Sequence, residues 1–327
     1  MTDQPEQISR ASAHAHPNIA LVKYWGKADT GRNLPATGSL SLTLGALQTH
    51  TTVARGASDT LTVNGDSRPE MAERLFRFLD SAFPDRPALS IDTQNDFPTA
   101  AGLASSASGF AAVVCAVDGL LQSGHSEHRL AQLAGGGSGS AARSLYGGIV
   151  RLDAPATEND DIRLRPLAEP ADWPLEVLVA VIDEGPKAVG STEGMERTRT
   201  TSPYYSGWID SHARDLDLAT DAVGKRDFAA LADVTEHSFF KMHAVMMSSQ
   251  PALLYWLPAS VGVVRLVADL RARGVPACCT MDAGPQVKVV TTPDAATELA
   301  SAITGVAGVQ RVIRSGLGNA PVVNLER

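Results

Sequence analysis

A run of small residues at 98–109, P-T-A-A-G-L-A-S-S-A-S-G, is the stretch of this chain best suited to bind an anion. It lies between an alternating segment at 89–93, typical of a strand, and an apolar run at 110–121, typical of a helix. Small residues let the backbone approach a phosphate, and the free N–H groups at a helix start favour negative charge. Ser105, Ser106 and Ser108 add hydroxyls that could hold Mg²⁺. The alternative is a capped helix with small packing residues, since the spacing matches neither the lysine-bearing P-loop nor a dinucleotide-binding loop.

A second small-residue loop, G-G-G-S-G-S-A-A-R-S-L-Y-G-G at 135–148, carries a single arginine, Arg143. An arginine in such a loop suits the bidentate capture of a carboxylate or a phosphate. The alternative, a flexible linker, is disfavoured because a Leu-Tyr pair and an apolar strand at 149–152 follow at once. The loop therefore predicts a second anion site.

Charged and hydroxyl side chains mark three other stretches. Lys23 and Lys27 flank the sequence Y-W-G, which favours an anion pocket dehydrated by the aromatic rings over a strand end with surface lysines. Asp282 begins the turn D-A-G-P, where an aspartate usually caps its own loop. The polar stretch 187–201 leads into a helix, and its Ser191, Thr192 and basic residues could border a phosphate or form a capped helix.

The elements that must position these residues follow from hydrophobic periodicity. We expect a half-buried strand at 38–44, where small polar residues alternate with Leu, and a central strand at 175–182. Further strands are expected at 51–55, 60–63, 149–152, 275–281, 286–292 and 309–314. Helices are expected at 69–82, 110–121, 127–133, 206–223, 228–247, 259–273 and 294–304, and an exposed loop with one short strand at 154–172.

Composition restricts the class of protein. The 327 residues suffice for two lobes, and 44% hydrophobic and 20% charged content are those of an ordinary globular chain. A net charge of −8 with no Lys/Arg-rich run argues against a nucleic-acid partner. No apolar run reaches a membrane span and residues 1–12 have no signal-peptide core, so we expect no membrane partner and a cytoplasmic location. The three cysteines have no disulfide or zinc spacing and are expected to be buried thiols.

Four separated motifs together resemble the diphosphomevalonate decarboxylase family, part of the superfamily of galactokinase, homoserine kinase, mevalonate kinase and phosphomevalonate kinase. They are N-I-A-L-V-K-Y-W-G-K at 18–27, P-T-A-A-G-L-A-S-S-A-S-G-F at 98–110, G-S-G-S-A-A-R-S-L-Y-G-G at 137–148 and T-M-D-A-G-P at 280–285. The resemblance implies an α+β, two-lobe fold like that of the superfamily's kinases. An N-terminal ATP-binding lobe (1–183) would have a mixed sheet with helices, and a C-terminal lobe (184–327) an antiparallel sheet packed by helices. It also implies a homodimer.

The resemblance implies ATP and Mg²⁺ as cofactors and assigns roles to individual residues. Asp282, Arg143, Lys23 and Ser106 would be catalytic, with Asp282 taking or orienting the substrate hydroxyl proton and Ser106 also binding the metal. The substrate would contact Tyr24, Trp25, Gly26, Lys27, Arg74, Ser138, Gly139, Ser140, Ala141, Ala142, Arg143, Ser191 and Thr192. The nucleotide would contact Asn95, Ala101, Gly102, Leu103, Ala104, Ser105 and Ser106.

The implied reaction is the ATP-dependent decarboxylation of mevalonate 5-diphosphate to isopentenyl diphosphate, with ADP, phosphate and CO₂ as the other products. This is a step of the mevalonate pathway of isoprenoid biosynthesis. Alternatives of the same class are a decarboxylase acting on the monophosphate and a mevalonate 3-kinase that stops after phosphorylation. The alternative of another class is a non-catalytic metabolite-binding homologue, which would have no need for Asp282.

Three positions depart from the family pattern. Many relatives have a pair of hydroxyl residues at Gly38-Ser39, and cysteine or serine at Ala142. Both changes are to smaller residues and are expected to affect the fit of the substrate. Some bacterial relatives have arginine at Thr192 while others have threonine, so the diphosphate is expected to have one fewer charged partner here than in the former.

Overall fold

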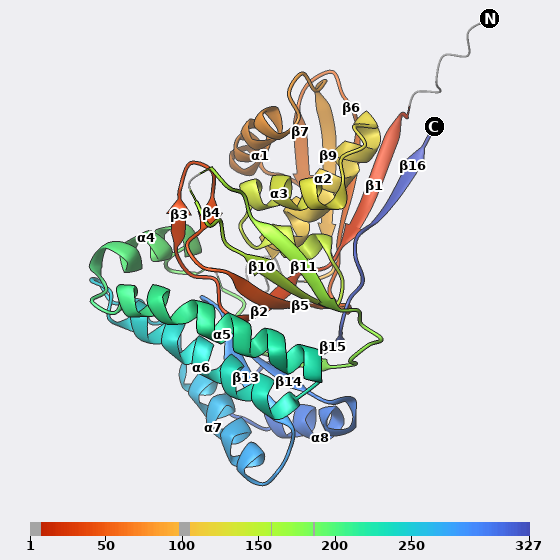
Figure 1. Ribbon diagram of the computed structural model, residues 1–327. Coiled ribbons are helices and arrows are strands. Elements are labelled where there is room, and N and C mark those ends of the chain that lie inside the picture. Colours follow the sequence, from red (N-terminus) through yellow and green to blue (C-terminus); the bar gives the residue numbers. More distant parts are fainter. Residues whose placement is uncertain (1–7, 98–104, 158, 186) are drawn as a thin grey trace, which may run out of the picture.

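A six-stranded mixed sheet forms the upper part of the molecule in a computed structural model that describes residues 8–97, 105–157, 159–185 and 187–327 (Figure 1). Its strand order is β16-β1-β6-β9-β7-β8, and β7 pairs with β9 in parallel while the other neighbours are antiparallel. The strands are β1 (Arg10–Ala15), β6 (Thr49–Arg55), β7 (Thr60–Val63), β8 (Asp66–Ser67), β9 (Leu89–Asn95) and β16 (Val322–Glu326).

Three helices accompany this sheet: α1 (Pro69–Ala82), α2 (Ser105–Leu121) and α3 (Glu127–Gly137). The small residues of α2 let it pack closely on the alanine face of β1, where Ala11, Ala13 and Ala15 are fully buried. The predicted bounds of the helix at 69–82 are confirmed. The second small-residue loop is more regular than expected, since its first glycines complete α3 and residues 141–145 form the 3₁₀ helix η1 (Ala141–Leu145).

A second sheet, in the order β11-β10-β5-β2, lies between the upper layer and the helices below it (Figure 1). Its strands are β2 (Asn18–Val22), β5 (Ser39–Thr43), β10 (Ile149–Asp153) and β11 (Arg163–Ala168), while β3 (Lys27–Asp29) and β4 (Leu34–Pro35) form a separate hairpin. The prediction that residues 38–44 are half-buried was wrong, because every residue of β5 is buried. Leu40 and Leu42 join the core below the sheet, and the serine face of β5 is covered as well.

The lower part of the molecule is a four-stranded antiparallel sheet in the order β13-β14-β12-β15. Its strands are β12 (Glu176–Val181), β13 (Ala277–Met281), β14 (Val287–Thr291) and β15 (Arg311–Gly316). One face packs against α7 (Pro258–Ala272) and α8 (Pro293–Thr304), and the other shares a core with the second sheet, α5 (Tyr205–Lys225) and α6 (Phe228–Met247). The remaining helix is α4 (Ser191–Thr201).

The expected α+β architecture, with a mixed N-terminal sheet and an antiparallel C-terminal sheet, is confirmed. Two strands connect the parts in a way that periodicity did not indicate. β12 precedes residue 183 but pairs with β14 and β15, and β16, absent from the predicted elements, runs beside β1 (Figure 1). The division into 1–183 and 184–327 stays a prediction. Within the described ranges no helix is long and apolar enough to cross a membrane, and all three cysteines are buried thiols.

Candidate active site

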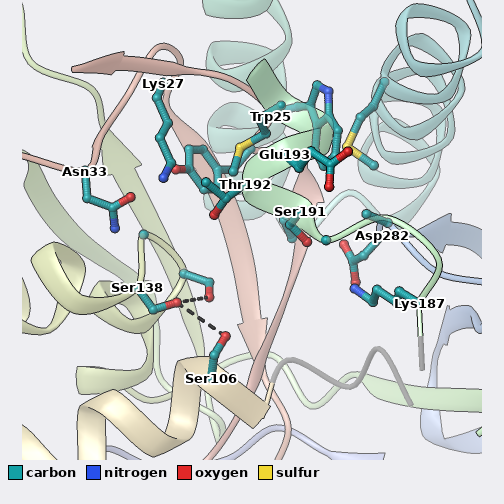
Figure 2. Close-up of a pocket in the computed structure, with 18 of the residues that line it drawn as sticks. Trp25, Lys27, Asn33, Ser106, Ser138, Lys187, Ser191, Thr192, Glu193 and Asp282 are labelled. Carbon is teal, nitrogen blue, oxygen red and sulfur yellow. Dashed lines mark hydrogen bonds between the residues drawn. The ribbon is translucent and has the colours of Figure 1, made fainter. Parts of the chain in front are cut away.

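A cavity of about 700 Å³ opens between the second sheet, α4 and the β13–β14 turn (Figure 2). Twelve of the residues predicted from the sequence line it together: Tyr24, Trp25, Lys27, Arg74, Ser106, Ser138, Gly139, Ser140, Arg143, Ser191, Thr192 and Asp282. Figure 2 shows Asp282 and Lys187 on one side of the cavity and Ser106 and Ser138 on another. Residues from six separated stretches of the chain therefore converge on one space.

Asp282 is held between two buried lysines. Lys23, which follows β2, places its Nζ 2.7 Å from Asp282 Oδ1, and Lys288 of β14 places its Nζ 3.0 Å from Oδ2. Both lysine side chains are 1% exposed, whereas that of Asp282 is 31% exposed. Burial alone would raise the pKa of the Asp282 carboxyl, but the two cations outweigh it and hold that pKa well below its usual range. The cavity thus contains a carboxylate that stays ionised.

Arg143 lies on η1 and is 2% exposed. Its Nη1 donates to Ser39 Oγ at 3.0 Å, and its Nε donates to Asn18 Oδ1 at 3.3 Å. Burial lowers its pKa to about 10, against the opposing effects of Tyr24 and Asp282, so the guanidinium is charged at neutral pH. Among the described residues no carboxylate lies within ion-pair distance of it. A buried cation placed in this way is suited to an anion supplied by a ligand.

The start of α2 separates this cavity from a second one of about 550 Å³. Asn95, Ser105 and Ser106 line the second cavity, with an apolar wall that includes Leu61, Val63, Met71, Leu75, Phe110 and Val113. Ser106 and Arg74 line both cavities, and Ser138 Oγ lies 3.3 Å from Ser106 Oγ. A ligand in one cavity could therefore meet a ligand in the other at Ser106. The predicted nucleotide contacts Ala101, Gly102, Leu103 and Ala104 lie outside the described residues.

Three predicted substrate contacts lie away from the cavity. Ala141 and Ala142 are fully buried in the upper core, so their neighbours Ser140 and Arg143 line the cavity instead. Gly26 has φ +108°, and a Cβ on it would lie 2.1 Å from Tyr205 Oη. Gly26 therefore allows a close approach of α5 rather than contributing a side chain.

Gly38, where a smaller residue was expected to affect the fit of the substrate, packs against the protein's own helix and strand. A Cβ at this position would lie 2.5 Å from Leu216 Cδ2 and 2.7 Å from the Leu152 carbonyl oxygen. Atoms of α5 and β10 therefore occupy the space that a side chain at position 38 would need. His212 of α5 also lies 2.8 Å, through its Nε2, from the Gly38 carbonyl oxygen. The small residue at position 38 allows helix packing, and Ser39 provides the contact with Arg143.

Sequence reasoning missed several polar residues of the site. Asn33 and Glu193 line the cavity, and Asn18 both lines it and binds Arg143, whereas Lys187, which also lines it, is one of the basic residues expected beside Ser191 and Thr192. Asn18 Nδ2 also donates to Ser144 Oγ at 2.8 Å and to the Ser140 carbonyl oxygen at 2.9 Å. A polar residue at the start of an apolar strand was the available signal for Asn18, and a lysine inside V-K-V-V was the signal for Lys288.

Comparison with known proteins places this cavity in context. Residues 15–162 match the diphosphomevalonate decarboxylase-like N-terminal domain, and residues 177–323 match the mevalonate 5-diphosphate decarboxylase C-terminal domain. The diphosphomevalonate decarboxylase mvd1 of Aspergillus fumigatus is 38% identical over 309 residues, which cover 86% of this chain and 76% of that protein. The chain belongs to the diphosphomevalonate decarboxylase family.

Solved structures agree with this assignment. The mevalonate diphosphate decarboxylase from Enterococcus faecalis superposes with a TM-score of 0.89 at 33% identity, covering 98% of this chain and 100% of that one. A structure of MDDEF in complex with MVAPP, AMPPCP and magnesium superposes with a TM-score of 0.88 at 35% identity and the same coverage. The sequence-based identification of the family and of its fold is confirmed.

The site of this diphosphomevalonate decarboxylase family member fits a nucleotide with its Mg²⁺. The start of α2 offers two adjacent serines beside a cavity whose lining is mainly apolar and includes the polar side chains of Asn95 and Arg74. In the described part of the chain no group of three or more His, Cys, Asp or Glu side chains could hold a metal ion by itself. The ion would therefore depend on phosphate oxygens of the nucleotide, as is usual for Mg²⁺, and Ser106 as its protein ligand stays a prediction.

Proposed function

We propose that this protein catalyses the ATP-dependent decarboxylation of mevalonate 5-diphosphate to isopentenyl diphosphate, releasing ADP, phosphate and CO₂. The observation that carries the proposal is that Asp282 and Arg143 line one cavity, which meets a second cavity at Ser106. An ionised carboxylate and a buried guanidinium are the two groups that a hydroxy acid needs around its hydroxyl and carboxylate. The relatives' names and the ligands named for MDDEF support the same reaction.

In the first step the tertiary hydroxyl oxygen of the substrate bonds to the γ-phosphorus of ATP, and ADP leaves. Asp282 orients the hydroxyl by accepting its proton in a hydrogen bond. Lys23 and Lys288 lower the pKa of the Asp282 carboxyl, so the carboxylate is a weak base. The proton therefore moves on to a phosphate oxygen as the new O–P bond forms. Lys23 offsets charge on the transferring group, because phosphoryl transfer depends mainly on positioning and electrostatics.

In the second step the C–O bond to the new phosphate breaks and the carboxylate leaves as CO₂, its bonding electrons forming the double bond. Arg143 holds that carboxylate in line with the departing phosphate. Positive character develops at the adjacent carbon, and Asp282 is placed to stabilise it. The role of Arg143 follows from its buried charge and its fixed hydrogen bonds to Asn18 and Ser39.

The diphosphate anchors the substrate away from the reacting carbon. Its candidate partners are Tyr24, Lys27, Arg74, Ser138, Gly139, Ser140, Ser191 and Thr192, all of which line the cavity. Binding energy from these remote contacts positions the hydroxyl and the carboxylate. Mg²⁺, when bound with the nucleotide, neutralises charge on the phosphates, and Ser106 would be its ligand.

A substrate panel tests the proposal directly. We expect ADP and CO₂ to appear in equal amounts with mevalonate 5-diphosphate, and at least about 10²-fold more slowly with mevalonate or its 5-phosphate, because the remote diphosphate contacts are lost. Coupled ADP release and trapping of labelled CO₂ are the measurements. ADP without CO₂ would indicate a 3-kinase, a preference for the monophosphate would indicate the sister decarboxylase, and no ADP with any substrate would indicate a binding homologue.

The cytoplasmic location and the homodimer stay predictions. Light scattering would test the homodimer by measuring the molar mass in solution.

The activity should also depend on the protonation of Lys23. Burial lowers the pKa of this lysine to about 8, with Asp282 opposing and Lys288 and Arg143 adding to the decrease. Because the reaction uses the charged ammonium, kcat/KM should fall as the pH rises through about 8. In Lys23→Arg this alkaline decrease should move to much higher pH, since a guanidinium stays protonated. A decrease at the same pH in both proteins would contradict the role of Lys23.

A further inference from the structure

Lys288 occupies a position that the fold would give to an apolar residue. It lies in β14, opposite Thr280 of β13 and Val179 of β12, and is 1% exposed. The residue two places along, Val290, belongs to the core shared with the second sheet, as does Val179. Lys288 therefore lies at the end of a row of core side chains, next to the buried polar residues Thr280 and Gln286, and its Nζ reaches Asp282 Oδ2 at 3.0 Å across the β13–β14 turn.

Stability alone does not account for a lysine here. Moving an ammonium group out of water is costly, and the attraction to a carboxylate in the interior often does no more than offset that cost. A methionine has similar length and would fill the same space without desolvating a charge. Asp282 does not need Lys288 as its counter-ion either, because Lys23 already binds its other oxygen at 2.7 Å.

We propose that Lys288 is a positioning residue for the phosphorylation step, fixing the orientation of the Asp282 carboxylate toward the substrate hydroxyl. The inference rests on the proposed function. The terminal torsion of an aspartate is broad, so one lysine on one oxygen leaves the carboxylate free to rotate. Two lysines from different parts of the fold, one after β2 and one in β14, each bind one oxygen, which fixes the plane of the group and turns its remaining lone pairs toward the cavity.

The two lysines have different surroundings, which separates their roles. Lys23 follows β2 in the motif that also carries Tyr24, Trp25 and Lys27 of the cavity lining, and is assigned to the transferring phosphoryl group. Lys288 lies on β14 and binds the other oxygen of the carboxylate, and neither lysine lines either described cavity. If the charge of Lys23 is drawn toward the incoming phosphate during the reaction, Lys288 keeps Asp282 ionised and in place.

The pH dependence of the reaction offers a readout of this arrangement. Besides the two lysines, the titratable or charged groups that act on Asp282 or face it are Lys187 before α4, Arg143 on η1 and His243 on α6. Burial lowers the pKa of His243 to about 3, so its ring stays neutral over the working range. The two lysines bound to the carboxylate hold its pKa below the usual range, and removing one of them should raise it.

The test is the variant Lys288→Met in the full-length protein. We expect kcat for ADP release to fall about 10- to 100-fold, with KM for both substrates within about threefold, since the loss is in orientation rather than in binding. The free energy of unfolding in urea should be unchanged or higher, because Asp282 keeps Lys23 as its partner. The acid limit of the kcat/KM profile should move up by about one pH unit.

Two further variants make the result decisive. Val290→Ala perturbs the same face of β14 without touching Asp282, and we expect its kcat and pH profile to match wild type despite lower stability. In an Asp282→Asn background, Lys288→Met should lower kcat by less than about twofold further, because the two residues act as one unit. Wild-type kcat and pH profile in a folded Lys288→Met protein would overturn the inference, as would additive effects in the double variant. The proposed function would stand in both cases, since it fails only if wild type releases no CO₂.

Discussion

Replacing Asp282 by asparagine should lower kcat by about 10³-fold or more while mevalonate 5-diphosphate still binds. The amide keeps the shape of the side chain but loses the negative charge that orients the hydroxyl and stabilises the developing positive carbon. Substrate binding should persist because the diphosphate contacts lie on other elements of the cavity. Coupled ADP release gives kcat, and isothermal titration calorimetry with mevalonate 5-diphosphate gives the affinity.

This variant also leaves Lys23 and Lys288 buried without the carboxylate that binds both. Its free energy of unfolding should therefore decrease, so a loss of activity must be separated from a loss of folded protein. The double variant Asp282→Asn, Lys288→Met removes one of the two lysines and should recover stability without recovering activity. Turnover near that of wild type in folded Asp282→Asn would rule out the proposed chemistry.

The sequence was most informative where a functional residue lies inside a local pattern. Asp282 at the head of D-A-G-P, Arg143 in a run of small residues and Ser106 at a helix start all line the cavity at places their motifs indicated. The start of α1 could be predicted as well, since a proline at its first position and a spaced apolar face are local signals.

Residues whose role depends on a distant partner could not be found in this way. Lys288 and Lys23 bind the same Asp282 carboxylate, although more than 250 positions of the chain separate the two lysines. Asn18 binds Arg143 from 125 positions away. No periodicity reports such contacts, because they arise when separate sheets pack together.

The same reason explains what was misjudged in the fold. Alternation of small polar residues and Leu at 38–44 indicates one apolar face, and the burial of the other face is a property of the packed sheets. β16 was not predicted because the residues beyond β15 show no strong pattern, and their pairing with β1 is decided by the other end of the chain. The space around Gly38, too, is set by α5 and β10 rather than by its neighbours in the sequence.

Replacing Arg143 by lysine should lower kcat/KM by about 10²- to 10³-fold even though the positive charge is kept. The guanidinium is oriented by Ser39 and Asn18, and its planar fork can bind both oxygens of a carboxylate. A lysine is a point charge with no fork, so it would hold the carboxylate of the substrate less firmly and allow it to rotate out of line with the departing phosphate. Initial rates of ADP and CO₂ release over a range of substrate concentrations measure the effect.

Arg151→Lys is the matched control. Arg151 is also mostly buried, on the neighbouring strand β10, and binds Asp153 and Asp217 rather than lining the cavity. We expect kcat/KM within about twofold of wild type there, because neither Arg151 nor its two carboxylate partners line the cavity. If Arg143→Lys lost no more activity than Arg151→Lys, charge without geometry would suffice at position 143. The carboxylate would then have to be aligned by another group, and the hydrogen bonds of Asn18 and Ser39 would serve only to keep a buried cation in the fold.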